Sequence, residues 1–440
     1  MRNNRIAPKV AWDANSVSQN EMDEASSKRW RIGYWMTAKK MKKIQFDRFI
    51  SKCQKENMEI LELDFDNIEA QLPLHAIVHK LSDFIVQSDQ GDLYAKNIIE
   101  KMEVLEKNHP EVLILDPIDA VRILCNRYSQ YSLMKTLCAE GPIRTPPFVL
   151  LKDGDTKQIT ALLEKDQISF PFVGLLFIPV CKHLAAHGTE NAHRMQLVFG
   201  PHGLKDIETP CVIQQFIRHG GILYKMFAIG DDTFISSRPS LRDFTEGDYP
   251  TVAFESHKIS KIGCISHLTK QQVNFSSDAL PAEICGDMPR VFAREFRKST
   301  GLSLFGMDLI VDQSSGQVYV IDVNTFPSYD SLPNFNDLLY RFLVVSLKRQ
   351  RTIEKRGTVD SGIGSSAESD NSDSEKKLKQ LLHQSSKASH LSGENIALYE
   401  PDRERLKKYY GIPKTFKSQL CISLNSPNGR NRGRSNTEHS

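Results

Sequence analysis

The sequence lacks the short motifs that identify the commonest phosphate-transferring and zinc-dependent enzymes. It contains no G-x-x-x-x-G-K-[ST] loop and neither an H-R-D nor a D-F-G tripeptide, so we expect neither a P-loop enzyme nor a protein kinase. Zinc is not indicated, because neither C-x-x-C nor H-E-x-x-H occurs. The 8 cysteines are scattered along the chain, which is typical of reduced structural thiols in a cytoplasmic or nuclear protein.

Long apolar runs and a strong excess of one charge are also missing. The longest nearly continuous apolar run, residues 170–180, is too short to span a bilayer, and the first residues have no apolar core of a signal peptide. With 57 Lys and Arg against 54 Asp and Glu, the net charge is +3, so nucleic-acid binding is not expected. Anion recognition must come from local clusters in a chain whose 440 residues suffice for about two to four domains.

The apolar pattern predicts α/β structure in the first third of the chain. Short β-branched segments alternate with amphipathic ones, which is the βαβ-like order of a mostly parallel sheet. We expect strands at residues 31–36, 60–65, 75–80 and 112–115, and helices at 38–56, 94–107 and 119–137. Further on we expect strands at 212–217, 222–229 and 233–237 and a last helix at 336–350. The polar segments before residue 30 and after residue 350 are expected to be disordered.

The most informative stretch is residues 303–327, SLFGMDLIVDQSSGQVYVIDVNTFP. Two apolar, β-branched segments flank the turn-forming sequence QSSGQ, which predicts a hairpin. Asp308 and Asp322 have their midpoint at residue 315 in that turn, so they should face each other, although like charges opposite one another destabilise a ladder. Asn324 lies on the same face as Asp322. These oxygen ligands suit a hard cation, most simply Mg²⁺; the alternative is a sheared register with both acids in solvent.

Several lysines stand where an anionic ligand would stabilise them. Lys40 lies with Lys39, Lys42 and Lys43 in the first two turns of helix 38–56, where cations oppose the helix dipole and unpaired N–H groups favour an anion. Lys80 follows a strand whose carboxyl end is the usual ligand edge of an open α/β sheet. Lys225 shares the parity of apolar residues on strand 222–229, which costs free energy unless an anion is near. The alternatives are a solvated lysine face and a snorkelling lysine at a sheet edge.

Eight short motifs follow one another in order along the chain. They are RIGYWMTAKKMKK, HAIVHKLSD, LDPIDAVRILCNR, FPFV with CKHLAAHGT, VIQQFIRHGGILYKMF, RPSLRDF, SHKIS, and SLFGMDLIVD with VIDVNTFPSY. Each alone would be weak, but together, over residues 30–347, they resemble the inositol-tetrakisphosphate 1-kinases, also called inositol 1,3,4-trisphosphate 5/6-kinases.

The resemblance implies an α/β (α+β) chain with the ATP-grasp fold: an N-terminal βαβ-type domain, a central lid domain and a C-terminal metal-hairpin domain. We expect a disordered segment at 1–29, the N-terminal α/β domain at 30–138, the central ATP-grasp domain at 139–226, the C-terminal ATP-grasp domain at 227–350, and a disordered, phosphorylatable tail at 351–440.

The resemblance also implies the residues of the site. Those matched to ATP contacts are Arg122, Lys182, Gln214, Gln215, Phe216, Ile217, Lys225, Ser240, Ser256 and Ser260. Those matched to inositol phosphate contacts, or lying in neighbouring motifs, are Lys40, Lys80, His187, Gly188, His193, Lys225, Arg238, Asn324 and Ser328. Asp308, Asp322 and Asn324 match the Mg²⁺ ligands, and two ions are expected with ATP. Arg127, His79 and His219 are expected to be structural.

The implied activity is Mg²⁺-dependent transfer of the γ-phosphate of ATP to an inositol polyphosphate. The acceptor would be the 5- or 6-hydroxyl of inositol 1,3,4-trisphosphate, the 1-hydroxyl of inositol 3,4,5,6-tetrakisphosphate, or both. Positioning and charge neutralisation supply most of the catalysis in such reactions, so no dedicated general base is required. Two alternatives remain: an ATP-grasp carboxylate–amine ligase, and an inositol phosphate-binding protein with impaired catalysis.

The chain departs from the family pattern just before Lys182. Seven residues, 174–180, intervene where the family continues directly; in a regular strand they would flip the face on which Lys182 emerges. Pro179 is not expected inside a central ladder. The insert is either a bulge or the product of an alternative splice boundary or gene-model error, and we favour the second. The loop 187–193 is one residue longer than usual, and Ser328 stands where glycine is common.

The polar tail carries a separate motif at residues 360–365, DSGIGS. It resembles a phosphodegron in which Ser361 and Ser365 are phosphorylated and then bound by an F-box ubiquitin ligase. We expect the protein to be a monomer located in the cytoplasm, with an additional nuclear pool as an open alternative.

Overall fold

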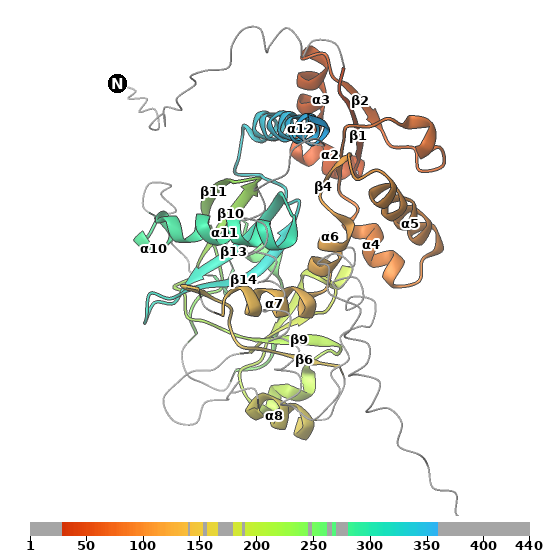
Figure 1. Ribbon diagram of the computed structural model, residues 1–440. Coiled ribbons are helices and arrows are strands. Elements are labelled where there is room, and N and C mark those ends of the chain that lie inside the picture. The colour runs from red at the N-terminus through yellow and green to blue at the C-terminus, as the bar shows by residue number, and fades with distance from the viewer. Residues whose placement is uncertain are drawn as a thin grey trace, which may run out of the picture. The chain divides into compact units, whose positions relative to one another are not determined.

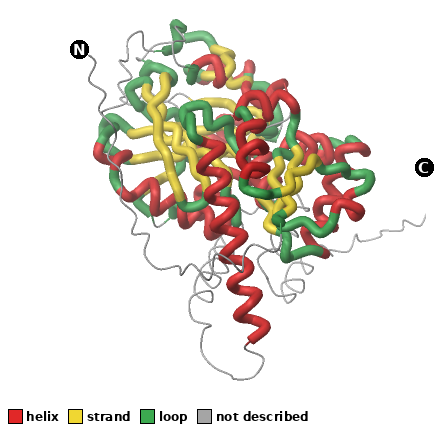
Figure 2. Tube along the Cα trace, turned by 90° about the horizontal axis from the view of Figure 1, so that it is seen from above, coloured by secondary structure: helices red, strands yellow, loops and turns green. Residues whose placement is uncertain are grey.

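The computed structural model describes most of the chain between its two polar ends. The residues that it describes are 29–139, 141–152, 156–165, 179–186, 190–244, 249–261, 266–269 and 280–359. All of them lie in the compact unit Met1–Gly362. Their strands form three sheets, and helices lie beside each group of strands (Figures 1 and 2). No helix among these residues is long and apolar enough to cross a membrane.

The first sheet has four strands in the order β2-β1-β3-β4, and every pair in it is parallel. Its strands are β1 (Arg31–Trp35), β2 (Glu59–Glu62), β3 (Ala76–His79) and β4 (Leu113–Leu115). The helices of this part are α2 (Ala38–Ile44), α3 (Phe46–Lys55), η2 (Ile68–Gln71), α4 (Ser82–Asp89), α5 (Leu93–Asn108) and α6 (Ile118–Cys125). The predicted parallel α/β sheet is confirmed, and Lys80 directly follows β3.

The helix predicted over residues 38–56 is broken in the middle. Thr37 caps its start, because the Thr37 side chain accepts a hydrogen bond from the Lys40 amide. Gln45 has a φ of 53° and ends α2, so the chain turns before α3 begins. The prediction of one continuous helix is wrong here, because the apolar spacing continues across the break.

The helix predicted over residues 119–137 is also two helices. Asn126 is extended, with φ −108° and ψ 121°, and separates α6 from α7 (Arg127–Leu137). The Asn126 side chain accepts hydrogen bonds from the amides of Tyr128 and Ser129, which caps the start of α7. The two arginines of the predicted helix, Arg122 and Arg127, therefore lie on different helices.

The second sheet has five strands in the order β11-β10-β13-β14-β5. Its strands are β5 (Ile143–Arg144), β10 (Ile222–Ile229), β11 (Asp232–Pro239), β13 (Leu304–Val311) and β14 (Val318–Thr325). β13 and β14 form the predicted hairpin, and β10 pairs antiparallel with β13 on its other side. The helices that follow in this part of the chain are α10 (Ala282–Cys285), α11 (Asp287–Thr300) and α12 (Phe335–Val359), which is longer than the predicted helix 336–350.

The third sheet has five strands in the order β12-β8-β7-β9-β6. Its elements are β6 (Phe148–Leu151), α8 (Thr156–Lys165), β7 (Pro179–His183), η3 (Glu190–His193), β8 (Arg194–Leu197), η4 (Pro201–Asp206), β9 (Cys211–Gln215), β12 (Val252–Glu255) and α9 (Ser256–Ile259). Pro179 is the first residue of β7 and pairs with Gln215. The expectation that Pro179 stays out of this ladder is wrong, because the first residue of a strand tolerates proline.

The sheets are not built from three uninterrupted stretches of chain. β5 precedes the third sheet in sequence and joins the second, whereas β12 follows β11 and joins the third. The predicted domain boundary between residues 226 and 227 falls inside β10, and the domain ranges stay a prediction. One buried apolar cluster contains residues of the first sheet's helices, such as Met102, together with Leu309 and Val320 of the hairpin. The first sheet thus shares its core with the strands that carry the acids.

Candidate active site

Asp308 and Asp322 are direct partners across the hairpin. Nearer the turn the register is different, because Leu309 pairs with Val320 and leaves Ile321 as an extra residue on β14. Without this β-bulge, Ile321 would stand opposite Asp308 and Asp322 would be displaced by one position. The bulge is therefore what brings the two carboxylates together, and the predicted facing pair is confirmed. Asn324 follows on β14 as the partner of Gly306.

The side chain of Asp308 is 16% exposed and closely surrounded by charge. Burial raises its pKa, as does the neighbouring Asp322, while Lys225 acts in the opposite direction; the net shift is upward. Lys225 is the partner of Asp308 on β10, and its Nζ lies 3.3 Å from Asp308 Oδ1. Among the described residues this Oδ1 is buried without a hydrogen-bond partner. Lys225, predicted from parity to need an anion, thus stands beside the acid pair.

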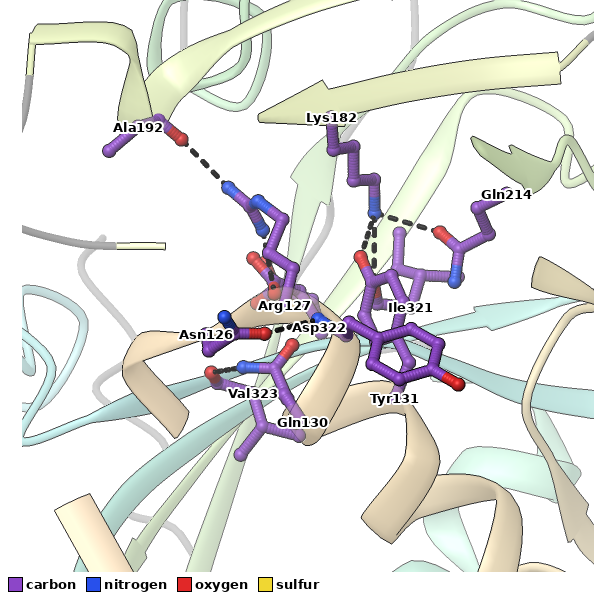
Figure 3. A network of polar contacts seen from close by, with 12 residues as sticks. Asn126, Arg127, Gln130, Tyr131, Lys182, Ala192, Gln214, Ile321, Asp322 and Val323 are labelled. Carbon is purple, nitrogen blue, oxygen red and sulfur yellow. Dashed lines mark hydrogen bonds and ion pairs between the residues drawn. The ribbon is translucent and has the colours of Figure 1, made fainter. Parts of the chain in front are cut away.

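Arg127 holds the second carboxylate (Figure 3). Its Nη1 lies 3.1 Å from Asp322 Oδ1 and its Nη2 donates to Ala192 O at 2.7 Å. The Arg127 side chain is 3% exposed. Burial alone would lower the pKa of Arg127, but the adjacent Asp322 and Tyr131 together outweigh it and the net shift is upward. Arg127 was expected to be structural, and its contact with a candidate metal ligand was missed; the capping residue Asn126 just before it was the available signal.

Arg122 lies elsewhere. Its guanidinium is buried on α6 and pairs with Asp89 and with Glu103, the latter at 2.9 Å. Both partners belong to the helices of the first sheet. The structure therefore brings Arg127 to the acid pair, and Arg122, predicted as an ATP contact, is paired with these two acids instead.

Lys182 reaches the site from β7. Its Nζ donates to Tyr131 Oη at 2.6 Å, to Gln214 Oε1 at 2.8 Å and to the Ile321 carbonyl at 3.0 Å (Figure 3). Burial lowers the pKa of Lys182 to about 8. The residues directly before Pro179 lie outside the described part of the chain, but from Pro179 onward β7 presents Lys182 to β14. Lys182 therefore emerges towards β14, and not on the opposite face that a regular strand through the insert would give.

The predicted strand 212–217 ends at Gln215, the last residue of β9, and the segment that follows it leads to a buried histidine, His219. His219 Nδ1 lies 2.6 Å from the Ile217 carbonyl, and its Nε2 lies 2.8 Å from Ser240 Oγ. Because a carbonyl can only accept, Nδ1 carries the proton and Nε2 accepts from the Ser240 hydroxyl. The His219 ring also contacts Phe216, with ring centroids 5.3 Å apart. His219, expected to be structural, therefore links two of the predicted ATP contacts, Ile217 and Ser240.

Lys40 and Lys80 meet the end of the hairpin. Lys80 Nζ donates to the carbonyl and hydroxyl of Thr325, at 2.7 and 2.8 Å. Lys40 Nζ donates to the carbonyls of Phe326 and Pro327, at 2.6 and 2.7 Å. Burial lowers the pKa of Lys80 to about 8 and holds the pKa of Lys40 well below its usual range. The two predicted anion contacts thus converge just past Asn324.

The remaining predicted contacts are spread around this centre. Arg238 pairs with Asp330 at 3.2 Å and donates to Ser331 Oγ at 2.7 Å. The His193 ring lies next to that of His257, with centroids 5.2 Å apart. The others are placed as follows: Gln215 at the end of β9, Ser256 and Ser260 at the two ends of α9, and Ser328 in the loop after β14. His187, Gly188, residues 174–178 and Ser361 and Ser365 lie outside the described residues.

Comparison with known proteins agrees with the motifs. Residues 138–345 match the model of the inositol 1,3,4-trisphosphate 5/6-kinase ATP-grasp domain, and residues 31–121 match that of the pre-ATP-grasp domain of the same family. The chain is 36% identical over 339 residues to an inositol-tetrakisphosphate 1-kinase of Xenopus laevis, covering 76% of this chain and 83% of that protein. It is 37% identical over 326 residues to the protein of that name in Danio rerio, covering 73% and 80%.

A solved structure with a similar trace is an ATP-grasp ligase from Chryseobacterium gregarium, with a TM-score of 0.45 and 12% identity, covering 72% of this chain and 97% of that one. A likeness of this size carries no argument about activity. The two family models and the two vertebrate relatives agree on one family. The region that they match includes the facing acids and the lysines beside them. The chain belongs to the inositol 1,3,4-trisphosphate 5/6-kinase family.

Proposed function

We propose that this protein is an ATP-dependent inositol polyphosphate kinase. The acceptor is a free hydroxyl of inositol 1,3,4-trisphosphate (5- or 6-position), of inositol 3,4,5,6-tetrakisphosphate (1-position), or of both. The observation that carries the proposal is the facing pair Asp308 and Asp322, with Lys225, Lys182 and Arg127 around it. Two carboxylates among three cations suit a reaction in which phosphate charge must be held and neutralised.

The donor set fits Mg²⁺. Asp308 offers a buried carboxylate oxygen without a hydrogen-bond partner among the described residues, and Asp322 and Asn324 follow on one face of β14. Carboxylate and amide oxygens are ligands that Mg²⁺ accepts. We infer that these three residues hold the ion, with two ions accompanying ATP. When bound, Mg²⁺ offsets the charge of the ATP phosphates.

Other residues of the site bind the phosphates of the two substrates and orient the metal ligands. Lys182 and Lys225 are placed to neutralise the phosphates of ATP, and Arg127 fixes the orientation of Asp322. Lys40 and Lys80 provide ammonium groups for the phosphates of the inositol substrate, with His193 and Arg238 as further contacts. The acceptor hydroxyl loses its proton late in a loose transition state, so no side chain is required to remove it beforehand.

The alternative of an impaired binding protein rested on the insert before Lys182. That alternative is weakened, because β7 delivers Lys182 to Gln214 and to the Ile321 carbonyl. The alternative of a carboxylate–amine ligase is disfavoured by the lysines at the end of the hairpin, which suit a polyanion better than a small amino acid.

The test is an assay of ADP formation by the purified full chain with ATP, Mg²⁺ and a panel of inositol phosphates, without any amine. Turnover that depends on an inositol trisphosphate or tetrakisphosphate supports the proposal, and mass spectrometry of the product identifies the isomer. Binding of inositol phosphate without ADP formation would support the impaired alternative. ADP formation only with a carboxylate and an amine would establish a ligase.

Three further properties are the oligomeric state, the location in the cell and a partner of the tail. We infer a monomer of the cytoplasm, with an additional nuclear pool as an alternative, and recognition of phosphorylated Ser361 and Ser365 by an F-box ubiquitin ligase. Gel filtration coupled to light scattering, cell fractionation and precipitation with a phosphopeptide of residues 358–368 test these three statements.

A further inference from the structure

Side chains of α7 and of the nearby Thr145 cover one edge of β14, the strand that carries Asp322 and Asn324. The pairing of β14 with β5 covers Val318 and Tyr319. Beyond them, the carbonyls of β14 receive side-chain donors: Thr145 Oγ1 on Val320 at 3.4 Å and Tyr131 Oη on Ile321 at 3.1 Å. Gln130 Nε2 donates to the carbonyl of Val323 (Figure 3). These contacts bracket Asp322, so α7 holds the stretch of backbone that carries the second acid.

Tyr131 differs from its neighbours because its hydroxyl joins two groups with different roles, and it also lies beside Arg127. It donates to the carbonyl of Ile321, the extra residue of the bulge, and it accepts from Lys182 Nζ at 2.6 Å. Tyr131 is 1% exposed, and its ring packs edge-on against Phe148 with centroids 5.4 Å apart. Burial raises the pKa of Tyr131, so the hydroxyl keeps its proton and these two hydrogen bonds have a fixed direction.

The ammonium of Lys182 is fully satisfied by this arrangement. Its three N–H donors match three acceptors, the Tyr131 hydroxyl, Gln214 Oε1 and the Ile321 carbonyl. One of these acceptors belongs to the bulge, and a second is the hydroxyl that binds the same carbonyl. The position of the lysine and the backbone of the bulge are thus joined through one hydroxyl group.

We propose that Tyr131 is a positioning residue that couples Lys182 to the β14 bulge and thereby sets the lysine and the Asp308–Asp322 pair in one arrangement. The role assigned to Lys182 rests on the proposed function. Loss of the hydroxyl removes one acceptor from the ammonium and one donor from the bulge carbonyl. Both the affinity for ATP and the Mg²⁺ requirement should change, whereas the affinity for the inositol phosphate should not.

The test compares Tyr131→Phe with Gln130→Met in the full-length chain. Tyr131→Phe removes one oxygen and keeps the packed ring. Gln130→Met, the matched control, removes a contact from the same helix to the same strand without touching Lys182. We expect Tyr131→Phe to raise the KM for ATP and the Mg²⁺ concentration at half-maximal rate by about fivefold to tenfold, with the KM for inositol phosphate within about twofold. Gln130→Met loosens β14 beside Asp322 and should lower the Tm and shift the Mg²⁺ requirement, but it should leave the KM for ATP within about twofold, because it does not touch Lys182.

A double-variant cycle separates coupling from a general structural effect. If Tyr131 acts through Lys182, then Tyr131→Phe should add little to the loss of ATP affinity already caused by Lys182→Met. Additive losses would overturn the proposal, as would equal kinetics of Tyr131→Phe and Gln130→Met. ATP binding is also measured directly by calorimetry without any acceptor. That measurement tests the coupling even if no inositol phosphate is turned over, so failure of the proposed function stays distinguishable, and thermal melts identify a variant that does not fold.

Discussion

The sharpest prediction compares two buried arginines: Arg127, which contacts Asp322, and Arg122, which contacts Asp89 and Glu103. Each is a buried arginine paired with carboxylate, and each is replaced by methionine, which keeps the length of the side chain and removes the charge. Arg127→Met takes the partner from Asp322, whose side chain is only 17% exposed. Arg122→Met takes the partner from Asp89 and Glu103, which are 40% and 31% exposed and can be hydrated instead.

These exposures set the expected magnitudes. Removal of one member of a buried pair costs about 3–5 kcal/mol, and because Asp322 also has cations nearby we expect the lower end for Arg127→Met. At about 2 °C per kcal/mol for a chain of this size, Tm falls by about 6 °C. For Arg122→Met, whose partners are partly in solvent, we expect about 1–2 kcal/mol. The activities should diverge more widely: about 100-fold lower kcat/KM for Arg127→Met and a change within about twofold for Arg122→Met.

The assay is steady-state ADP formation with saturating inositol phosphate, with thermal melts of both variants as the control for folding. Measurement at a temperature about 15 °C below the lower Tm, a margin of about two and a half such shifts, keeps both proteins native. The reasoning is refuted if Arg122→Met loses as much activity as Arg127→Met, or if Arg127→Met keeps near-normal kcat/KM.

Three further predictions concern Asp308, Lys80 and His219. Asp308→Asn should stay folded and lose most phosphoryl transfer; near-normal turnover with Mg²⁺ would show that the hairpin does not hold the ion. The pKa of Lys80 is lowered to about 8, so the ammonium is present below that pH and lost above it; the KM for inositol phosphate should rise as pH passes through 8, and Lys80→Gln should flatten the profile. His219→Phe removes the link between the Ile217 carbonyl and Ser240 and should raise the KM for ATP several-fold, by about 1 kcal/mol per lost hydrogen bond; an unchanged KM would leave His219 a packing residue.

The hairpin was the part of the site most accessible to sequence reasoning. Its turn residues and apolar arms predicted two strands, and the midpoint of Asp308 and Asp322 predicted their pairing correctly. The bulge was not predicted, because the position of an extra residue depends on the hydrogen bonds that its backbone finds. At Ile321 these come from Lys182 and Tyr131, which are distant in sequence.

The apolar pattern could not predict the breaks in two helices. Gln45 and Asn126 interrupt segments whose apolar spacing continues, and a single residue in another backbone region does not disturb that spacing. The consequence was larger at Asn126, since a continuous helix gives no reason to prefer Arg127 over Arg122. A carboxamide directly before a basic residue was a capping signal that could have been weighed.

The bulge at Ile321 also limits how the length of this hairpin can change. Side chains alternate between the two faces of a strand, so one residue added or removed between Asp322 and Asn324 would turn the acid and the amide to opposite faces. One added between Ile321 and Asp322 would move both of them away from Asp308. Substitution of Ile321 is compatible with the site, because its contacts with Lys182 and Tyr131 are made by the backbone carbonyl. The turn around residues 312–317 lies beyond the bulge and can lengthen without moving the acids. Insertions and deletions should therefore be tolerated in the turn and rejected within the three residues that follow the bulge.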